Sequence, residues 1–139
     1  MAEYWDIYNK NFEKINKRVK RGDKLEDDEY HLVINAWIVN SKGEFLITQR
    51  VATKPHPLMW ECTGGSAIEG DNPLDACVRE IKEEVEIDIV REDFRLFCYH
   101  ENIYEKDNRV EHWIEQYYIV NTKLEKDSWS FVENDVDGV

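Results

Sequence analysis

The segment from Gly64 to Ile87, GGSAIEGDNPLDACVREIKEEVEI, most strongly constrains the fold because its second half has the pattern of an amphipathic helix. Apolar residues recur along DNPLDACVREIKEEV at i, i+3, i+4, i+7 and i+11, which places them in one stripe. The stripe consists of Leu74, Cys77, Val78, Ile81 and Val85. Asp71 or Asn72 is suited to cap the start, and Pro73 suits the first turn. The pattern therefore predicts a helix that buries one face.

Three acidic residues of this segment fall away from the apolar stripe. Glu80, Glu83 and Glu84 stand at i, i+3 and i+4, so a helix brings their carboxylates within reach of one cation. Ionised carboxylates at this spacing repel one another, and a hard divalent cation would relieve the repulsion. A solvated glutamate face is the ordinary alternative. The Gly-Gly pair before the helix and the Arg79 that opens the cluster favour a Mg²⁺ site, with Mn²⁺ as the alternative ion.

These residues also carry a resemblance to a known family. The segment resembles the signature box of the Nudix hydrolases, in which glycines, an acidic residue, an Arg-Glu pair and a Glu-Glu pair occur at fixed spacing. The matching positions are Gly65, Arg79, Glu80, Ile81, Glu83, Glu84 and Ile87. Asp71 replaces the first glutamate of the box, and Glu86 replaces its last glycine. Family helices often end at this last position with positive φ, where a glutamate would cost about 1 kcal/mol.

The resemblance implies a role for each residue of the box. The implied metal ligands are Glu80, Glu83, Glu84 and the carbonyl of Gly64. Asp71 would pair with Arg79 and join the loop to the helix, while Gly65 would serve the backbone geometry of the loop. The general base would be either Glu80 or Glu115, because family members use a box glutamate or an acid from another segment.

The resemblance also implies a reaction. Nudix hydrolases cleave nucleoside diphosphates linked to another group, and divalent ions would neutralise the phosphate charge and lower the pKa of water. The chain is thus expected to be a Mg²⁺-dependent, MutT-like pyrophosphohydrolase acting on a nucleoside diphosphate derivative or a related organic diphosphate. The alternative from another class is a non-catalytic nucleotide- or metabolite-binding module. Retention of all the metal-type glutamates favours catalysis.

A second resemblance extends outside the box. The pattern YHLVINAWIVNSKGEFLITQR, followed by MWECTGG, is similar to the branch of the superfamily related to isopentenyl diphosphate isomerases. Those isomerases have a catalytic cysteine at the position of Gly64, a metal-binding histidine at that of Ser66, and fewer box acids. The residues present favour hydrolysis, with isomerisation as a weaker alternative. Cys62 lies near the isomerase cysteine position, and His31 matches an isomerase metal ligand.

Strand patterns surround the predicted helix. Aromatic and β-branched residues predict an N-terminal pair from EYWDIYN and KRVKR, and hairpins from HLVINAWIVN with EFLITQRV and from FRLFCYHENIY with RVEHWIEQYYIVN. Strands before and after a helix predict an α/β domain with a mixed sheet. The resemblance sharpens this to a Nudix-type α/β/α sandwich forming a single domain over residues 1–139. Relatives usually continue with a further strand and a C-terminal helix, which this sequence is expected to lack.

Substrate contacts are predicted only as candidates. Those for phosphate are Arg50, Lys54 and His56, which precede the box. Those for stacking on an organic group are Trp60, Tyr104 and Trp113, with core packing as the alternative. The basic run KINKRVKRGDK is interpreted as a solvent-facing strand, with a phosphate-steering patch as the alternative. A small-molecule diphosphate is therefore the expected ligand, without a choice among nucleotides, sugar nucleotides, dinucleoside polyphosphates and isoprenoid diphosphates.

Composition excludes several classes. The formal charge of the 139-residue chain is −12, which disfavours nucleic-acid polymers and anionic membranes as partners. The sequence has no apolar run of membrane-spanning length and no signal-peptide pattern, so a cytoplasmic protein is expected. Cys62, Cys77 and Cys98 are odd in number and far apart, which argues against a disulfide framework or a structural zinc site. A monomer or a homodimer is expected.

Overall fold

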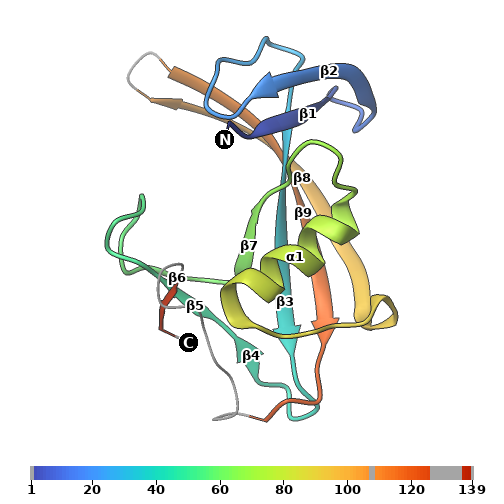
Figure 1. Cartoon of the computed structure of the whole chain (residues 1–139), viewed down its shortest axis with the longest axis vertical. Coiled ribbons are helices and arrows are strands. Elements are labelled where there is room, and N and C mark those ends of the chain that lie inside the picture. Colours follow the sequence, from blue (N-terminus) through green and yellow to red (C-terminus); the bar gives the residue numbers. More distant parts are fainter. Residues whose placement is uncertain (1, 107–108, 126–135, 139) are drawn as a thin grey trace.

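A mixed β-sheet with a helix on one face forms the centre of the molecule (Figure 1). The computed structural model describes residues 2–106, 109–125 and 136–138. Its elements in chain order are β1 (Tyr4–Tyr8), β2 (Lys14–Lys20), β3 (His31–Val39), β4 (Phe45–Leu46), β5 (Thr48–Arg50), β6 (Trp60–Glu61), β7 (Thr63–Ser66), α1 (Pro73–Val85), the 3-10 helix η1 (Arg91–Asp93), β8 (Phe94–Lys106), β9 (Arg109–Asn121) and β10 (Val136–Gly138). The α1 helix is long enough to carry the whole predicted acidic cluster.

The central strand of the sheet is β3. It pairs in parallel with β9, whereas β4 and β7 pair with it in the antiparallel direction. β8 then pairs antiparallel with β9 along nearly its whole length, as the sequence predicted for this hairpin. One parallel pair among antiparallel ones makes the sheet mixed, which confirms the predicted fold class.

The core lies between the sheet and α1. Alternate residues of β3 are buried, as expected for a strand with one covered face: Leu32, Ile34, Ala36 and Ile38. The stripe of α1 meets them with Cys77, Ile81 and Val85, each at most 1% exposed. The amphipathic pattern thus identified most of the buried face: Leu74 and Val78 of the stripe are only partly buried, and Ala76, outside it, is fully buried.

Both ends of α1 have defined caps. Asn72 is the N-cap, since its side-chain oxygen accepts from the backbone N–H of Asp75 at 2.9 Å. The sequence left the cap open between Asn72 and its neighbour Asp71, whose side chain contacts Arg79 instead. At the other end Glu86 has φ 60° and ψ 23°, which is the left-handed conformation implied for this box position.

We expect Glu86→Gly to raise the free energy of unfolding by about 0.5–1 kcal/mol, because glycine reaches this conformation without a Cβ clash. Urea denaturation of the two proteins measures the difference. Glu86→Ala is the matched control, since it removes the same side chain and keeps the Cβ. Equal stability of the glycine and alanine variants would show that backbone strain is absent at this position.

The N-terminal hairpin of β1 and β2 stands at one end of the sheet (Figure 1). It has a small core of its own from Trp5, Ile7 and Leu25. The backbone N–H of Gly70 donates to Asp6 at 2.9 Å, which ties the hairpin to the loop before α1. β2 is the predicted solvent-facing basic strand, and several of its cations pair with acids. The hairpin is therefore fixed beside the loop that carries the box.

Two predictions about strands were wrong. Residues 44–51 do not form one hairpin arm: β4 pairs with β3, whereas β5 leaves to pair with β6 and β10. A strand was not expected after Asn121, yet β10 pairs with β5 (Val136 opposite Arg50). A strand of three residues is too short to show an alternating pattern.

Helices in the described ranges are few. α1 is their one α-helix, so the second helical layer of the predicted sandwich is not among these residues. The predicted absence of a C-terminal helix concerns positions 126–135, which lie outside the described part. No helix in that described part is long and apolar enough to cross a membrane.

Candidate active site

A cleft of about 600 Å³ lies where β7 leads into α1. Residues from the helix, the Gly-Gly segment and distant strands line it together. The predicted site residues found in its walls are Arg50, Lys54, Gly64, Gly65, Arg79, Glu80, Glu83, Glu84 and Glu115. Folding thus gathers residues from Glu3 to Glu115, which lie far apart in the sequence.

Other candidates do not reach the cleft. Trp60 is 52% exposed and does not line it, although it was predicted to contact substrate. Successive residues of a strand point to opposite faces, and on β6 it is the neighbouring Glu61 that lines the cleft. The candidates His56, Tyr104 and Trp113 are also absent from its walls.

Two glycines allow the backbone of β7 to approach its neighbours closely. A Cβ on Gly65 would lie 2.6 Å from the carboxyl carbon of Glu80, so only glycine leaves room for that carboxylate. A Cβ on Gly64 would lie 2.1 Å from the carbonyl oxygen of Ile34, across the β3–β7 pairing. The Gly-Gly pair therefore sets both the strand pairing and the position of the first helix carboxylate.

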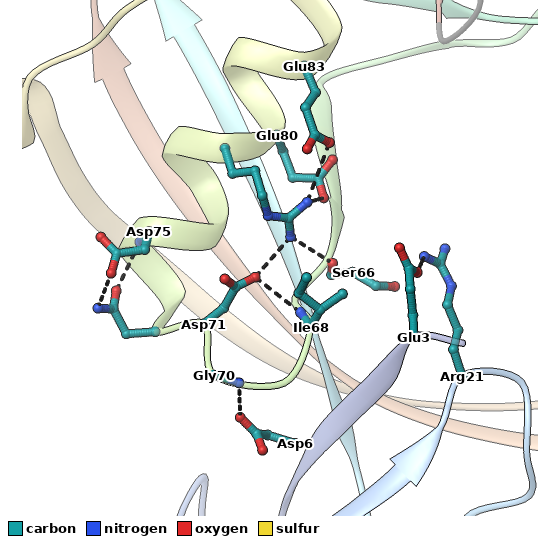
Figure 2. A network of polar contacts seen from close by, with 12 residues as sticks. Glu3, Asp6, Arg21, Ser66, Ile68, Gly70, Asp71, Asp75, Glu80 and Glu83 are labelled. Atoms are coloured by element: carbon teal, nitrogen blue, oxygen red, sulfur yellow. Dashed lines mark hydrogen bonds and ion pairs between the residues drawn. The ribbon is translucent and has the colours of Figure 1, made fainter. Parts of the chain in front are cut away.

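Arg79 is the centre of a network that joins the loop to the helix (Figure 2). Its Nη2 lies 2.9 Å from Oδ2 of Asp71, and its Nη1 lies 2.9 Å from Oε1 of Glu80. Nη1 also lies 3.4 Å from a carboxylate oxygen of Glu83. The same oxygen of Asp71 accepts the backbone N–H of Ile68, so the shorter acid still reaches both partners. The Asp71–Arg79 ion pair implied by the family resemblance is therefore present.

Glu84 has a different environment. The hydroxyl of Thr63 donates to its Oε2 at 2.7 Å, and Thr63 is fully buried in β7. Burial, aided by the nearby charges of Glu80 and Glu61, raises the pKa of Glu84 to about 7. Burial also raises the pKa of Glu80, opposed by Arg79. Ionised carboxylates are thus disfavoured here unless a cation compensates them.

The oxygen atoms that line the cleft are suitable ligands for a hard divalent cation. Carboxylates and the backbone carbonyl of a glycine are the oxygen ligands that Mg²⁺ prefers, and acidic side chains outnumber basic ones in the lining. In the described residues no three acids, histidines or cysteines are already grouped to hold a metal ion. Arg79 contacts Glu80 and Glu83, while Thr63 holds Glu84. A cation would compete with that guanidinium for the same carboxylates.

Comparison with known proteins identifies the family. The family model described as the NUDIX domain matches residues 29–139. The chain belongs to the Nudix family. This Nudix domain is 40% identical over 101 residues to an uncharacterised Nudix hydrolase of Listeria innocua and 41% identical to one of Listeria monocytogenes. Each match covers 70% of this chain and 60% of the relative, so the chain spans about 60% of the length of these curated proteins.

Solved structures agree with this fold. A protein of Deinococcus radiodurans superposes with a TM-score of 0.69 at 21% identity, covering 98% of this chain and 80% of that one. The dihydroneopterin triphosphate pyrophosphohydrolase of E. coli superposes with a TM-score of 0.59 at 26% identity, covering 75% of this chain and 77% of that one. The predicted family is therefore confirmed, whereas the isomerase-like branch stays a prediction.

Two residues bear on the isomerase alternative in this Nudix domain. Burial raises the pKa of Cys62 to about 12, so its thiol keeps its proton at neutral pH. His31 does not line the cleft; its ring stacks on Trp5 with the centroids 3.9 Å apart. Neither residue therefore favours isomerase chemistry in this cleft.

Several residues of the Nudix cleft were missed from the sequence. Glu61 pairs with Arg50, with Nη1 3.0 Å from Oε1. Its position two residues before Thr63 and the Gly-Gly pair was a usable signal. Glu3 and Arg21 form an ion pair of 2.6 Å at the edge of the cleft, and no local pattern could have indicated this because the hairpin brings them there.

The metal-free Nudix domain should lose stability as Glu84 ionises. Between its ordinary pKa of 4.5 and about 7, the folded protein holds a proton that the unfolded chain releases. This retained proton stabilises the folded protein fully below pH 4.5, and the stabilisation is lost as the pH rises through 7. The free energy of unfolding falls by at most about 3 kcal/mol. Glu84→Gln removes this titration. The variant should therefore become more stable than wild type by a margin that grows from pH 4.5 to pH 7. Urea unfolding with EDTA measures it; a difference that does not change with pH would contradict the expectation.

Proposed function

We propose that this Nudix domain is a Mg²⁺-dependent hydrolase that cleaves the diphosphate linkage of a nucleoside diphosphate derivative or a related organic diphosphate, with Mn²⁺ as the alternative ion. The observation that carries the proposal is the convergence of three helix carboxylates and the Gly64 segment on one cleft. Membership of a family whose general reaction is this hydrolysis supports it. So does the name of the E. coli neighbour, a pyrophosphohydrolase of an organic triphosphate.

In the proposed site Glu80, Glu83, Glu84 and the carbonyl of Gly64 would hold the metal. When bound, Mg²⁺ would screen the charge of the diphosphate and lower the pKa of a water molecule. A metal is needed because acidic side chains outnumber basic ones in the lining. Without a cation, these carboxylates would repel a polyanionic substrate.

Two basic residues of the lining offer positive charge to the substrate. Arg50 and Lys54 line the cleft from β5 and the loop after it. The guanidinium of Arg50 is fixed by Glu61 and by a 2.7 Å bond from Nε to the carbonyl of Pro55, so it keeps one orientation. We assign phosphate contact to these two cations, because a fixed guanidinium suits the paired oxygens of a phosphate group.

Two acids remain candidates for the general base. Glu115 lines the cleft from β9 and accepts a hydrogen bond from the hydroxyl of Tyr117, which orients its carboxylate. Glu80 lies on the helix beside Arg79. A base must hold a lone pair within reach of the attacking water, and both residues line the cleft in which that water would be bound. A cytoplasmic location, a single domain over residues 1–139 and a monomer or homodimer stay predictions.

Turnover of a substrate panel tests the proposed function. Nucleoside diphosphate sugars, dinucleoside polyphosphates, nucleoside triphosphates and isoprenoid diphosphates are incubated with the protein in Mg²⁺, in Mn²⁺ and in EDTA, and phosphate and monophosphate products are measured. We expect metal-dependent release from at least one class, lost in Glu83→Gln and kept in Glu86→Gln, which changes a glutamate just beyond the helix. Binding of panel members without turnover by the folded protein would favour the non-catalytic module.

A further inference from the structure

The N-terminal hairpin precedes the part of the chain that the family model matches, yet it contacts the Nudix box. The matched residues are 29–139, whereas β2, the second strand of the hairpin, ends at Lys20. The contacts are made with residues 67–71, which connect β7 to α1 and end at Asp71. We call this segment the box loop. Because Asp71 is the acid that contacts Arg79, the hairpin lies against a segment that continues directly into the proposed metal site.

The hairpin accepts two of the five backbone N–H groups of the box loop. The N–H of Glu69 donates to the carbonyl of Tyr4 at 2.8 Å, and the N–H of Gly70 donates to Oδ2 of Asp6 at 2.9 Å. The other three N–H groups bond to β3 or close a turn within the loop itself. Without the hairpin, the two N–H groups that it accepts would depend on water. The hairpin therefore fixes the half of the loop that leads to Asp71.

Asp6 is the side chain of the hairpin that is best suited to hold the loop. Its side chain is only 15% exposed, and Lys14 lies 2.8 Å from the same carboxylate oxygen that accepts the N–H of Gly70. An ionised acceptor forms a stronger hydrogen bond with a backbone N–H than a neutral one does. The Arg18–Glu69 ion pair joins the same two segments, but its side chains are 58% and 43% exposed, and such pairs contribute little.

A continuous series of polar contacts joins Asp6 to the proposed metal ligands (Figure 2). Asp71 follows Gly70 directly, and its Oδ2 lies 2.9 Å from Nη2 of Arg79. The Nη1 of the same guanidinium lies 2.9 Å from Oε1 of Glu80. Asp6 itself does not line the cleft. Any effect of Asp6 on the metal site is therefore indirect and passes through the loop.

The position of Arg79 affects how well the helix carboxylates can bind a cation. The guanidinium is shared among Asp71, Glu80 and Glu83, so each carboxylate receives only part of its hydrogen-bonding capacity. If the loop were released, Asp71 would hold the guanidinium less firmly. Arg79 would then interact more with the two helix glutamates and compete more strongly with a cation for them. Release of the loop is thus expected to weaken metal binding.

We propose that Asp6 is a positioning residue of the metal site, which acts through the box loop and the Asp71–Arg79 pair. The inference rests on the proposed function for the identity of the metal ligands. It extends the site to a hairpin that precedes the matched part of the chain. The hydrogen bond from Gly70 to Asp6 is the contact through which the hairpin acts.

Binding of Mn²⁺ to the full chain in the absence of substrate tests this role. Free Mn²⁺ is measured by electron paramagnetic resonance during a titration, and Glu83→Gln shows whether the bound ion lies in the cleft. Asp6→Ala should weaken binding about tenfold, the lower end of the usual cost of losing an outer partner of a metal ligand. Asp6→Asn keeps an oxygen acceptor and should bind within about twofold of wild type. Lys14→Met is the matched control, since it removes the ion pair and leaves the hydrogen bond from Gly70.

Two further comparisons separate positioning from a general loss of structure. Asp6→Ala combined with Asp71→Ala should bind Mn²⁺ no more weakly than Asp71→Ala alone, because both changes act on one path. Arg18→Glu should weaken binding by repelling Glu69 from the hairpin, although its added negative charge alone would attract the cation. Arg18→Glu combined with Glu69→Arg should restore binding. These two side chains are exposed, so this comparison remains informative if Asp6→Ala does not fold.

Several results in folded variants, as judged by thermal unfolding, would overturn the inference. They are wild-type affinity in Asp6→Ala, an equal loss in Asp6→Asn or Lys14→Met, and additive losses in the double variant with Asp71→Ala. If these variants bind Mn²⁺ as wild type does while a diphosphate is hydrolysed with Mg²⁺, the positioning role fails and the proposed function stands. If Mn²⁺ binding follows the expected order but no diphosphate is turned over, the proposed function fails and the positioning role stands.

Discussion

Glu84→Gln is expected to lower Mg²⁺-dependent turnover by at least about 100-fold while the protein stays folded. Loss of even an outer partner of a metal ligand typically costs 10–100-fold, and this change removes the charge of a proposed ligand itself. The amide still accepts the hydrogen bond from Thr63, so the packing around the side chain is kept. Since Glu84 is a buried acid whose pKa is raised to about 7, the neutral amide should also make the metal-free protein more stable at neutral pH.

Lower activity with unchanged or higher stability is a signature that misfolding cannot produce. The measurements are kcat/KM for the best substrate of the panel and urea unfolding, each for wild type, Glu84→Gln and the control Glu86→Gln. Glu86 is exposed just past the helix and does not line the cleft, so its variant should keep wild-type turnover. Wild-type turnover by Glu84→Gln would exclude this residue from the metal site.

Gly64→Ala and Gly65→Ala are expected to fail in different ways although they are adjacent and chemically identical. The added methyl group of Gly64→Ala meets the backbone oxygen of Ile34, which cannot move without breaking the β3–β7 pairing. We expect a loss of about 3 kcal/mol in the free energy of unfolding, the upper end of the usual cost of overpacking. The methyl group of Gly65→Ala meets the end of the Glu80 side chain, which can rotate away. The fold should survive, and turnover should fall at least about tenfold because a proposed metal ligand is displaced.

Urea unfolding and turnover of both variants separate the two effects. The pair is its own control, since one variant reports on the strand pairing and the other on the carboxylate. Wild-type turnover by Gly65→Ala would mean that the position of Glu80 against β7 is irrelevant to activity. Wild-type stability of Gly64→Ala would contradict the close β3–β7 approach.

The local parts of the fold were predictable from the sequence. A helix of thirteen residues has enough turns to show a 3.6-residue period, so the buried face of α1 followed from spacing. The acidic cluster was expected to face away from it, yet Glu80 and Glu84 are partly buried against β7. Long strands such as β8 and β9 carry a comparable signal. Strand pairing depends on tertiary contacts. Residues 44–51 therefore did not indicate that β4 pairs with β3 whereas β5 pairs with β6.

The candidate site was predictable where it is contiguous. The helix carboxylates, the Gly-Gly segment and Arg79 form one stretch of sequence, whereas Thr63 was missed because a threonine in a strand ordinarily indicates only β propensity. Trp60 was placed in the site by its residue type, yet the alternation of β6 presents Glu61 instead. Arg21 reaches the cleft only because the hairpin folds back on the loop before α1.

Hydrolysis in ¹⁸O-labelled water tests the central claim most directly. The best substrate of the panel is turned over with Mg²⁺ in labelled water, and the phosphate-containing products are analysed by mass spectrometry. Attack of water on a diphosphate phosphorus predicts one ¹⁸O atom in one of the two phosphate products, with no products in EDTA. A product that has the mass of the substrate and carries no ¹⁸O, or cleavage that continues in EDTA, would contradict a metal-dependent hydrolase.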